Sequence, residues 1–304
     1  MNLWQWFLSL FGHSTTTTTT KKPEPPIITT TTTTISGGKK MKIALVTGIN
    51  NYPNPANRLQ GCLNDANDWM AMLKNQYNFD RVDILIDSEV TIDNVDNKLR
   101  ELASLKPDTL VWCYSGHGSS VPDTNGDEPD GKDECLCLFD GFYVDDDIRK
   151  FLDTIELDTM DFIFFADSCH SGTVTKEFLM AMNDSSYVSV PKYMPPEDNM
   201  EAILLASLPV KKSILEIKDA KNEILFAGTT SDSYSYDASF NVNGVMRPNG
   251  AFTYYCLQVL KSNPIITYKD FYSKLRTYLP SRNYPQTPQF EPSNDQLGNK
   301  IIFG

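Results

Sequence analysis

The most constraining feature of the sequence is a series of short apolar runs that alternate with helical patterns. The runs are rich in branched and aromatic residues, and several end in glycine or aspartate. Strands that are apolar throughout are typical of parallel sheets, because helices bury both faces of such a sheet. We therefore expect an α/β fold, with a mostly parallel six-stranded sheet flanked by helices on both faces. The expected strands cover residues 42–48, 82–87, 109–116, 134–140, 161–167 and 223–229.

Five segments between and after these runs carry apolar residues at helical spacing. In the first, Leu63, Ala66 and Leu73 recur as they would on one face of an amphipathic helix. Thr91 precedes the second segment and has the hydroxyl of a good N-cap. The stretch 183–221 lacks such a period and is expected to be rich in loops. The expected helices cover residues 63–77, 91–105, 145–154, 251–260 and 268–278.

The first forty residues do not have a globular pattern. Threonine runs at 15–20 and 29–34 flank a proline-rich stretch, so we predict a flexible linker over 1–40 and one domain over 41–304. The apolar start, 1–12, has no preceding basic residue and no small-residue cleavage site, and it is too short to span a bilayer. It is either an interfacial anchor, a segment docked on the domain, or a frayed end, and no transmembrane span is expected.

Charge and cysteine content narrow the classes of function. The net charge of −12 and the pI of about 4.7 argue against nucleic-acid binding, which needs a basic surface. The negative charge favours cationic partners or substrates, or it serves only to keep the protein soluble. Most of the six cysteines lie inside apolar runs, as buried reduced thiols do. We therefore predict a reducing compartment and a cytoplasmic location.

Chemically reactive side chains follow the third and fifth expected strands. The segment "YSGHGS" places His117 after the third strand, and "DSCHSG" places Cys169 after the fifth. Sites in parallel sheets lie beyond the carboxyl ends of the strands. A cysteine nucleophile needs a base within hydrogen-bonding reach. His170 is adjacent in sequence, but neighbouring residues leaving a strand point to opposite sides, so we predict that His117 is the base.

Backbone and acidic groups complete the predicted site. Gly116 and Gly118 allow a tight turn around His117. The N–H groups of Gly118 and Cys169 are candidates for an oxyanion hole. Asp65 opens a helix after the first strand, and Asp167 lies two residues before the cysteine, so both carboxylates can line a pocket for a cationic side chain. The alternatives are a carboxylate favoured by the helix dipole for Asp65 and a strand-end cap for Asp167.

Two other cysteine chemistries fit the sequence poorly. A cysteine phosphatase holds phosphate with an arginine shortly after the nucleophile, and the corresponding position is Thr175. A zinc site could use Cys135 and Cys137, but these alternate across an expected strand and no histidine is near them in the sequence.

Taken together, the motifs resemble those of the metacaspases, including the bacterial relatives called orthocaspases. The resemblance extends from Met41 to about Leu279, and the cysteine signature Q-A-C-x-G of true caspases is absent. It implies a caspase-like fold and a monomeric cysteine endopeptidase that cuts proteins or peptides after Arg or Lys. It also implies that residues matching Asp65, Ser115 and Asp167 line the specificity pocket. The motifs are "YSGHGS", "DSCHSG", "GCLNDANDW", "DGKDE", "YVDDDI" and "GAFTYY".

The acidic stretch 123–134 raises the question of calcium. It nearly matches an EF-hand loop, but Glu128 stands where that loop needs glycine. The resemblance implies a different calcium site, whose ligands match Asp130 and the pair formed by Asp145 and Asp146. Its fourth position is Lys176, which would oppose a cation. The stretch is therefore either part of a calcium site or a solvated acidic loop.

Two further hypotheses concern processing and activity. The basic pairs Lys21–Lys22, Lys39–Lys40 and Lys211–Lys212 lie in segments that look exposed, so an enzyme that cuts after basic residues could cut itself there. The alternative from a different class is a catalytically silent caspase-fold module used for binding or scaffolding. The intact pair of His117 and Cys169 argues against that alternative.

Overall fold

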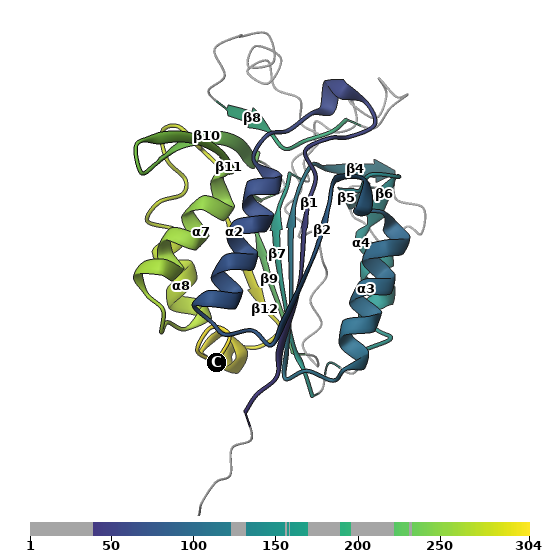
Figure 1. The fold of residues 1–304 in the computed structure, drawn as a ribbon, viewed down its shortest axis with the longest axis vertical. Coiled ribbons are helices and arrows are strands. Elements are labelled where there is room, and N and C mark those ends of the chain that lie inside the picture. Colours follow the sequence, from purple (N-terminus) through teal and green to yellow (C-terminus); the bar gives the residue numbers. More distant parts are fainter. Residues whose placement is uncertain are drawn as a thin grey trace, which may run out of the picture. The chain divides into compact units, whose positions relative to one another are not determined.

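A computed structural model describes residues 39–122, 132–155, 157, 159–169, 189–195, 222–230 and 233–304. These residues belong to one compact unit, Lys39–Gly304 (Figure 1). Nearly all of the predicted linker, 1–40, lies outside the described residues, as do Asp130, His170, Lys176 and two of the three basic pairs, Lys21–Lys22 and Lys211–Lys212.

A six-stranded sheet forms the centre of this unit, in the order β12-β9-β7-β3-β1-β2. Five strands are parallel, and β12 alone pairs antiparallel, with β9 at one edge. The prediction of a mostly parallel six-stranded sheet is therefore confirmed. The strands are β1 (Lys42–Gly48), β2 (Arg81–Ile86), β3 (Thr109–Ser115), β7 (Asp161–Asp167), β9 (Glu223–Ala227) and β12 (Gln289–Pro292).

Helices cover both faces of the sheet, as the apolar strands predict (Figure 1). In β3, Val111 and Cys113 pack into the core on the side of α2, α7 and α8, whereas Leu110 and Trp112 pack on the side of α3 and α4. This alternation follows from the two-residue period of a strand. The helices are α2 (Cys62–Asn75), α3 (Ile92–Ser104), α4 (Asp145–Leu152), α7 (Ala251–Ser262), α8 (Tyr268–Leu275) and α9 (Asp295–Gly298).

The ends of the predicted helices agree with the structure to within a few residues. The Oγ1 atom of Thr91 accepts a hydrogen bond from the N–H of Asn94, which confirms its predicted role as N-cap of α3. The short helix α9 was not predicted, although Asn294 caps it in the same way.

The predicted strand 134–140 is not part of the central sheet. Its residues form β5 (Lys132–Cys137), which pairs antiparallel with β4 (Gly118–Pro122) and β6 (Phe142–Val144) in a separate small sheet. A parallel partner would need a long crossover connection, whereas antiparallel neighbours need only a short one, and β6 follows β5 within a few residues. The place of a sixth central strand is taken by β12.

A hairpin near the site was also missed. Strands β10 (Tyr236–Val242) and β11 (Val245–Gly250) pair antiparallel. Asn243 and Gly244 join them with positive φ values of 54° and 87°, and the Asn-Gly pair is a strong hairpin signal that could have been used. A third strand, β8 (Ser189–Pro191), pairs with β10, although it lies in the stretch expected to be loop.

No helix among the described residues is both long and apolar enough to cross a membrane.

Candidate active site

The site lies at the carboxyl end of the central sheet, where the chain order reverses. Strand β1 pairs with β2 on one side and with β3 on the other, so the connections after β1 and β3 leave in different directions. Such a point in a parallel sheet is where ligands bind. Asp65 follows β1 in the chain. Ser115 is the last residue of β3, and His117 follows it. Asp167 is the last residue of β7, and Cys169 follows it.

The imidazole of His117 is held in one orientation. Its Nε2 atom lies 2.8 Å from the carbonyl oxygen of Asn57, which follows β1 in the short helix η2 (Pro55–Asn57). A carbonyl oxygen only accepts hydrogen bonds, so Nε2 carries the proton and Nδ1 of the neutral ring is a free base. Burial lowers the pKa of His117 to about 4, which keeps the ring neutral. The ring of Tyr52 packs against it, with centroids 5.0 Å apart.

Backbone contacts fix the turn that presents this ring. The N–H of His117 donates to the hydroxyl of Tyr52 at 2.7 Å, and the hydroxyl of Tyr114 donates to the carbonyl of His117, also at 2.7 Å. A Cβ atom on Gly116 would lie 2.4 Å from the Tyr114 hydroxyl oxygen and 2.7 Å from that of Tyr52. Glycine is therefore required here because the two hydroxyls approach the backbone closely.

The thiol of Cys169 is buried and held by the backbone of Ser235. Sγ lies 3.2 Å from the Ser235 carbonyl oxygen, to which it donates, and it accepts from the Ser235 N–H at 2.9 Å. Burial raises the pKa of the thiol well above its usual range, against the lowering effect of the Ser235 hydrogen bond. Within the described residues Nδ1 of His117 makes no hydrogen bond, so the two side chains are not bonded to each other in this state.

Both predicted oxyanion donors point at one oxygen atom. The N–H groups of Gly118 and Cys169 donate to the carbonyl oxygen of Lys192, at 3.0 and 3.1 Å. Two backbone donors that converge on one carbonyl form the geometry that stabilises a tetrahedral oxyanion. Lys192 belongs to the segment that follows β8, and nothing in the sequence pattern pointed to it.

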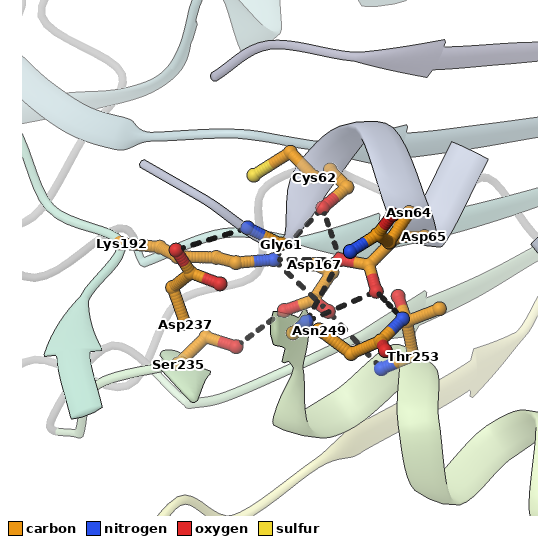
Figure 2. A network of polar contacts seen from close by, with 12 residues as sticks. Gly61, Cys62, Asn64, Asp65, Asp167, Lys192, Ser235, Asp237, Asn249 and Thr253 are labelled. Atoms are coloured by element: carbon orange, nitrogen blue, oxygen red, sulfur yellow. Dashed lines mark hydrogen bonds and ion pairs between the residues drawn. The ribbon is translucent and has the colours of Figure 1, made fainter. Parts of the chain in front are cut away.

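The three predicted pocket residues contact the ammonium group of the same lysine, and Figure 2 shows Asp65 and Asp167 beside it. Lys192 Nζ lies 2.8 Å from Ser115 Oγ, 3.2 Å from Asp167 Oδ2 and 3.3 Å from Asp65 Oδ2. The side chain of Lys192 is fully buried. Burial on its own would lower the pKa of Lys192, but the nearby carboxylates, Asp167 foremost, hold it well above its usual range.

Hydrogen bonds from the rest of the fold orient the two pocket carboxylates (Figure 2). Asp65 accepts from Ser115 Oγ at 2.7 Å, from Asn249 Nδ2 at 2.9 Å and from the N–H of Gly250. Burial raises the pKa of Asp65 to about 6, although Lys192 and these bonds oppose that rise. Asp167 accepts from Ser235 Oγ at 2.6 Å and from the N–H of Thr253 at 3.0 Å.

Gly250 forms one wall of this pocket. A Cβ atom there would lie 2.0 Å from Asp167 Oδ2 and 2.3 Å from Lys192 Nζ. The cationic group therefore occupies space that only glycine leaves open. The sequence analysis noted Gly250 inside the motif "GAFTYY" without giving it a role.

The predicted calcium ligands are described only in part. Asp145 and Asp146 lie in the first turn of α4, and Asp130 is outside the described residues. Burial, aided by the neighbouring Asp133 and Asp146, raises the pKa of Asp145 to about 7. No three acidic, histidine or cysteine side chains among the described residues converge on one metal position. The carboxylate oxygens present are of the kind that calcium prefers.

Several residues of the site were not found from the sequence. They are Asn57, Lys192, Ser235, Asn249 and Gly250. Asn57 contributes a backbone carbonyl, and Ser235 contacts Cys169 through its backbone, and backbone atoms carry no residue signature. Lys192 lies in a stretch without periodic pattern, so only its position in space reveals its contacts.

Comparison with solved structures identifies the fold. The caspase-1 structure from Spodoptera frugiperda superposes with a TM-score of 0.52 at 12% identity, covering 84% of this chain and 87% of that one, so the fold is caspase-like. Protein GSU0716 from Geobacter sulfurreducens superposes with a TM-score of 0.62 at 28% identity, covering 86% of this chain and 98% of that one.

Sequence comparison gives the family directly. The family model of the caspase domain, peptidase C14, matches residues 41–296. Metacaspase-1 of Kluyveromyces lactis is 30% identical over 83% of this chain and 66% of its own length, and metacaspase-1 of Meyerozyma guilliermondii is 27% identical over 84% and 70%. The chain therefore spans about two thirds of the length of these relatives. It belongs to the caspase-domain peptidase family, and within that family it is a metacaspase.

Proposed function

We propose that the chain is a cysteine endopeptidase that hydrolyses peptide bonds after Lys or Arg, with Cys169 as nucleophile and His117 as base. One observation carries the proposal. A lysine side chain lies in the acidic pocket while its own carbonyl oxygen accepts hydrogen bonds from the backbone N–H groups of Gly118 and Cys169. The carbonyl group of a residue held in this way is hydrogen-bonded to the backbone of the proposed nucleophile. The substrates are proteins or peptides with a basic residue at P1.

The chemistry follows from the protonation states of the pair. Nδ1 of His117 takes the thiol proton of Cys169, and the sulfur attacks the carbonyl carbon. The N–H groups of Gly118 and Cys169 stabilise the oxyanion. His117 then gives the proton to the departing amine, and a water molecule hydrolyses the thioester with His117 again as base. The Asn57 carbonyl holds the imidazole throughout and stabilises its protonated form.

Charge balance explains the basic preference. Asp65 and Asp167 are both buried, and two buried carboxylates without a cation would repel each other. A Lys or Arg side chain supplies the missing charge, and Arg can also form paired hydrogen bonds with a carboxylate. An acidic P1 side chain would add a third negative charge to the pocket and is expected to be excluded.

A fluorogenic peptide panel with Arg, Lys or Asp at P1 tests the proposal. We expect turnover with Arg and Lys, none with Asp, and none with any peptide for Cys169→Ala. Because burial raises the pKa of Asp65, the carboxylate takes up a proton as the pH is lowered, so the KM for basic peptides should rise. Equal rates for Arg and Asp would contradict the proposed pocket. No turnover and no labelling of Cys169 by a thiol-directed probe would favour the silent binding module.

We also propose that calcium activates the enzyme. Asp145 and Asp146 of α4 would hold the ion together with Asp130. When bound, the ion would neutralise a cluster of carboxylates next to the small sheet that carries Gly118. The position of Asp145 and Asp146 in one helical turn supports the proposal, because neighbouring carboxylate oxygens are ligands that calcium prefers.

We further propose that the protein is a monomer and that it works in a reducing, cytoplasmic setting. The six free thiols support the reducing setting, because they form no disulfide.

A further inference from the structure

The loop that connects β1 to α2, residues 49–61, carries the two residues that hold the imidazole of His117. The ring of Tyr52 packs against the imidazole, and its hydroxyl accepts the His117 N–H. The carbonyl oxygen of Asn57 accepts from Nε2. The only regular element in this loop is the three-residue helix η2, so contacts with neighbouring segments must fix its course.

Asp87 holds the start of this loop. It is the first residue after β2 and begins the short helix η3 (Asp87–Glu89). Its Oδ1 atom accepts hydrogen bonds from the N–H groups of Asn50 and Asn51, both at 2.9 Å, and its Oδ2 atom accepts from Asn51 Nδ2 at 2.7 Å. Hydrogen bonds to a carboxylate are stronger than those between neutral groups. Both oxygens of the Asp87 side chain are therefore used to fix the first residues of the loop.

The backbone of Asp87 is strained in the conformation that makes these contacts. Its φ of 47° lies in the left-handed region, which aspartate and asparagine enter more readily than most residues other than glycine. A residue in this region persists where the surrounding structure requires it, and such strain is concentrated at functional sites. The strain is a second observation, independent of the hydrogen bonds, that assigns a role to this position.

Asn50 carries the contact to the far end of the loop. Its side chain accepts from the Cys62 N–H at 2.9 Å and donates to the Gln60 carbonyl at 3.0 Å. Its own carbonyl accepts from the Leu59 N–H at 3.0 Å. One asparagine thus ties the start of the loop to its end, two residues after Asn57.

Asp237 on β10 anchors the far end of the loop from another direction. Its Oδ2 atom accepts from the N–H groups of Gln60 and Gly61, at 2.6 and 3.2 Å, and Figure 2 shows the contact with Gly61. The far end therefore keeps an anchor of its own when the contacts at the start are removed. Loss of the Asp87 side chain should displace the loop without releasing it from the domain.

We infer that Asp87 is a positioning residue for His117, which acts through the loop 49–61 by keeping Tyr52 and the Asn57 carbonyl against the imidazole. The inference rests on the proposed function and adds to it a residue at the end of β2. Without the carboxylate, the start of the loop moves and the Asn57 carbonyl leaves Nε2. The ring then turns, and Nδ1 no longer has the fixed orientation that proton transfer needs.

The acidic pocket should be affected less than the base. Asp65 and Asp167 are oriented by hydrogen bonds from the hairpin, from α7 and from the ends of other strands. None of those bonds involves Asp87. The inference therefore predicts a loss in kcat, with little change in the KM for peptides that have Arg at P1.

Steady-state kinetics with an Arg peptide measure this separation. Asp87→Gly removes the carboxylate but accepts the positive φ, and its kcat should fall about tenfold or more with KM within about threefold of wild type. Asp87→Asn keeps an acceptor oxygen and should retain at least about a third of the kcat. Asn78→Gly is the matched control, because Asn78 also has a positive φ, of 52°, but is exposed at the other end of α2. It should behave as the wild type.

Histidine NMR keeps the inference separate from the proposed function. In Cys169→Ala protein with 15N-labelled histidine rings, the Nε2 proton of His117 should exchange slowly with water, because the Asn57 carbonyl accepts it. The variant His117→Gln identifies this signal. We expect the signal to disappear when Asp87→Gly is added and to remain when Asp87→Asn or Asn78→Gly is added.

Each outcome decides one of the two statements. A slowly exchanging Nε2 proton in folded Asp87→Gly protein would show that the inference is wrong, whatever the peptide assay gives. If that proton is lost but the wild type cleaves no peptide under any condition, the positioning role stands and the proposed function fails. Asp87→Glu, which keeps the charge but moves the carboxylate by one methylene, repeats the test if Asp87→Gly does not fold. It should also lose the slowly exchanging proton.

Discussion

At the scale of single residues, the acidic pocket is defined by charges that the fold balances almost completely. Asp65 and Asp167 face one ammonium group, and the remaining negative charge is offset by donors from Asn249, Ser235 and backbone N–H groups. Charge-assisted hydrogen bonds of this kind are strong because they are shielded from water. The two carboxylates of the proposed pocket are therefore held in place by several hydrogen bonds each.

Gly250 provides the sharpest test of this pocket at the residue scale. In Gly250→Ala the new methyl group would overlap the positions of Asp167 Oδ2 and Lys192 Nζ. A displacement of about 1 Å at a reacting centre costs roughly 100-fold in rate. We therefore expect kcat/KM for Arg and Lys peptides to fall by about 100-fold or more in steady-state assays.

Gly141→Ala is the matched control for this substitution. Its Cβ would meet only Ile92 Cδ1, at 3.5 Å, which is ordinary van der Waals contact. This variant should keep wild-type kcat/KM. The Tm of both variants, measured by thermal unfolding, shows whether a loss of activity comes from a damaged pocket or from an unfolded protein. Full activity in a folded Gly250→Ala protein would contradict the assignment of the pocket.

At the scale of elements, three strand ends supply the site and the small sheet β4-β5-β6 connects it to α4. Strand β4 begins at the proposed oxyanion donor Gly118, and β6 leads directly into the first turn of α4 at Asp145. The first turn of α4 is therefore connected to Gly118 through two strand pairings, β6 with β5 and β5 with β4. This connection is the physical route by which a cation at α4 would affect the catalytic backbone.

The calcium proposal is tested at this helix. In the Cys169→Ala background, which cannot cut itself, calcium at about 100 times its Kd should raise the Tm by roughly 5 °C or more. Asp145→Asn should remove most of that rise, because it removes a proposed ligand. Scanning calorimetry with calcium and with chelator gives both values.

Asp147→Asn serves as the control, since Asp147 lies in the same helical turn but is half exposed and pairs with Lys150. It changes the net charge by the same amount without removing a proposed ligand. An identical calcium shift in the two variants, or no shift in the parent, would show that α4 does not hold calcium.

At the scale of the whole molecule, a buried ion pair joins the outer layer to the central sheet. Arg149 of α4 forms two hydrogen bonds, at 2.7 and 2.8 Å, with the carboxylate of Glu223 at the start of β9. Glu223 is fully buried and Arg149 is 8% exposed. Without Glu223, the buried guanidinium of Arg149 would lose both of these hydrogen bonds, and its longer contact with Asp153, 3.5 Å from Nε, would compensate the charge only in part.

Glu223→Ala should therefore lower the free energy of unfolding by about 3–5 kcal/mol. Urea unfolding in the Cys169→Ala background measures the loss. Lys300→Ala breaks the surface pair with Asp161, which is about half exposed on the lysine side, and should cost about 1 kcal/mol or less. Similar losses for the two variants would mean that the buried pair does not link the layers as described.

Much of this architecture was predictable, because strand and helix patterns are local. The apolar runs at β1, β3 and β7 and the helical period of α2 are visible within a few residues of sequence. The run at β5 was placed in the wrong sheet, because pairing partners depend on connection length and not on the run itself. The hairpin at Asn243 was predictable from its turn, whereas the three-residue strand β8 was not.

The sequence by itself determined the elements, the positions of His117 and Cys169 after two strands, and the carboxylates near them, because each of these depends on residue type and local period. Only the tertiary structure decided that the Asn57 carbonyl orients the imidazole and that Lys192 fills the pocket between Asp65 and Asp167. These contacts join residues far apart in the chain, and backbone atoms and irregular segments leave no periodic signal. Their positions follow from how the sheet, the small sheet and the hairpin pack around one strand end.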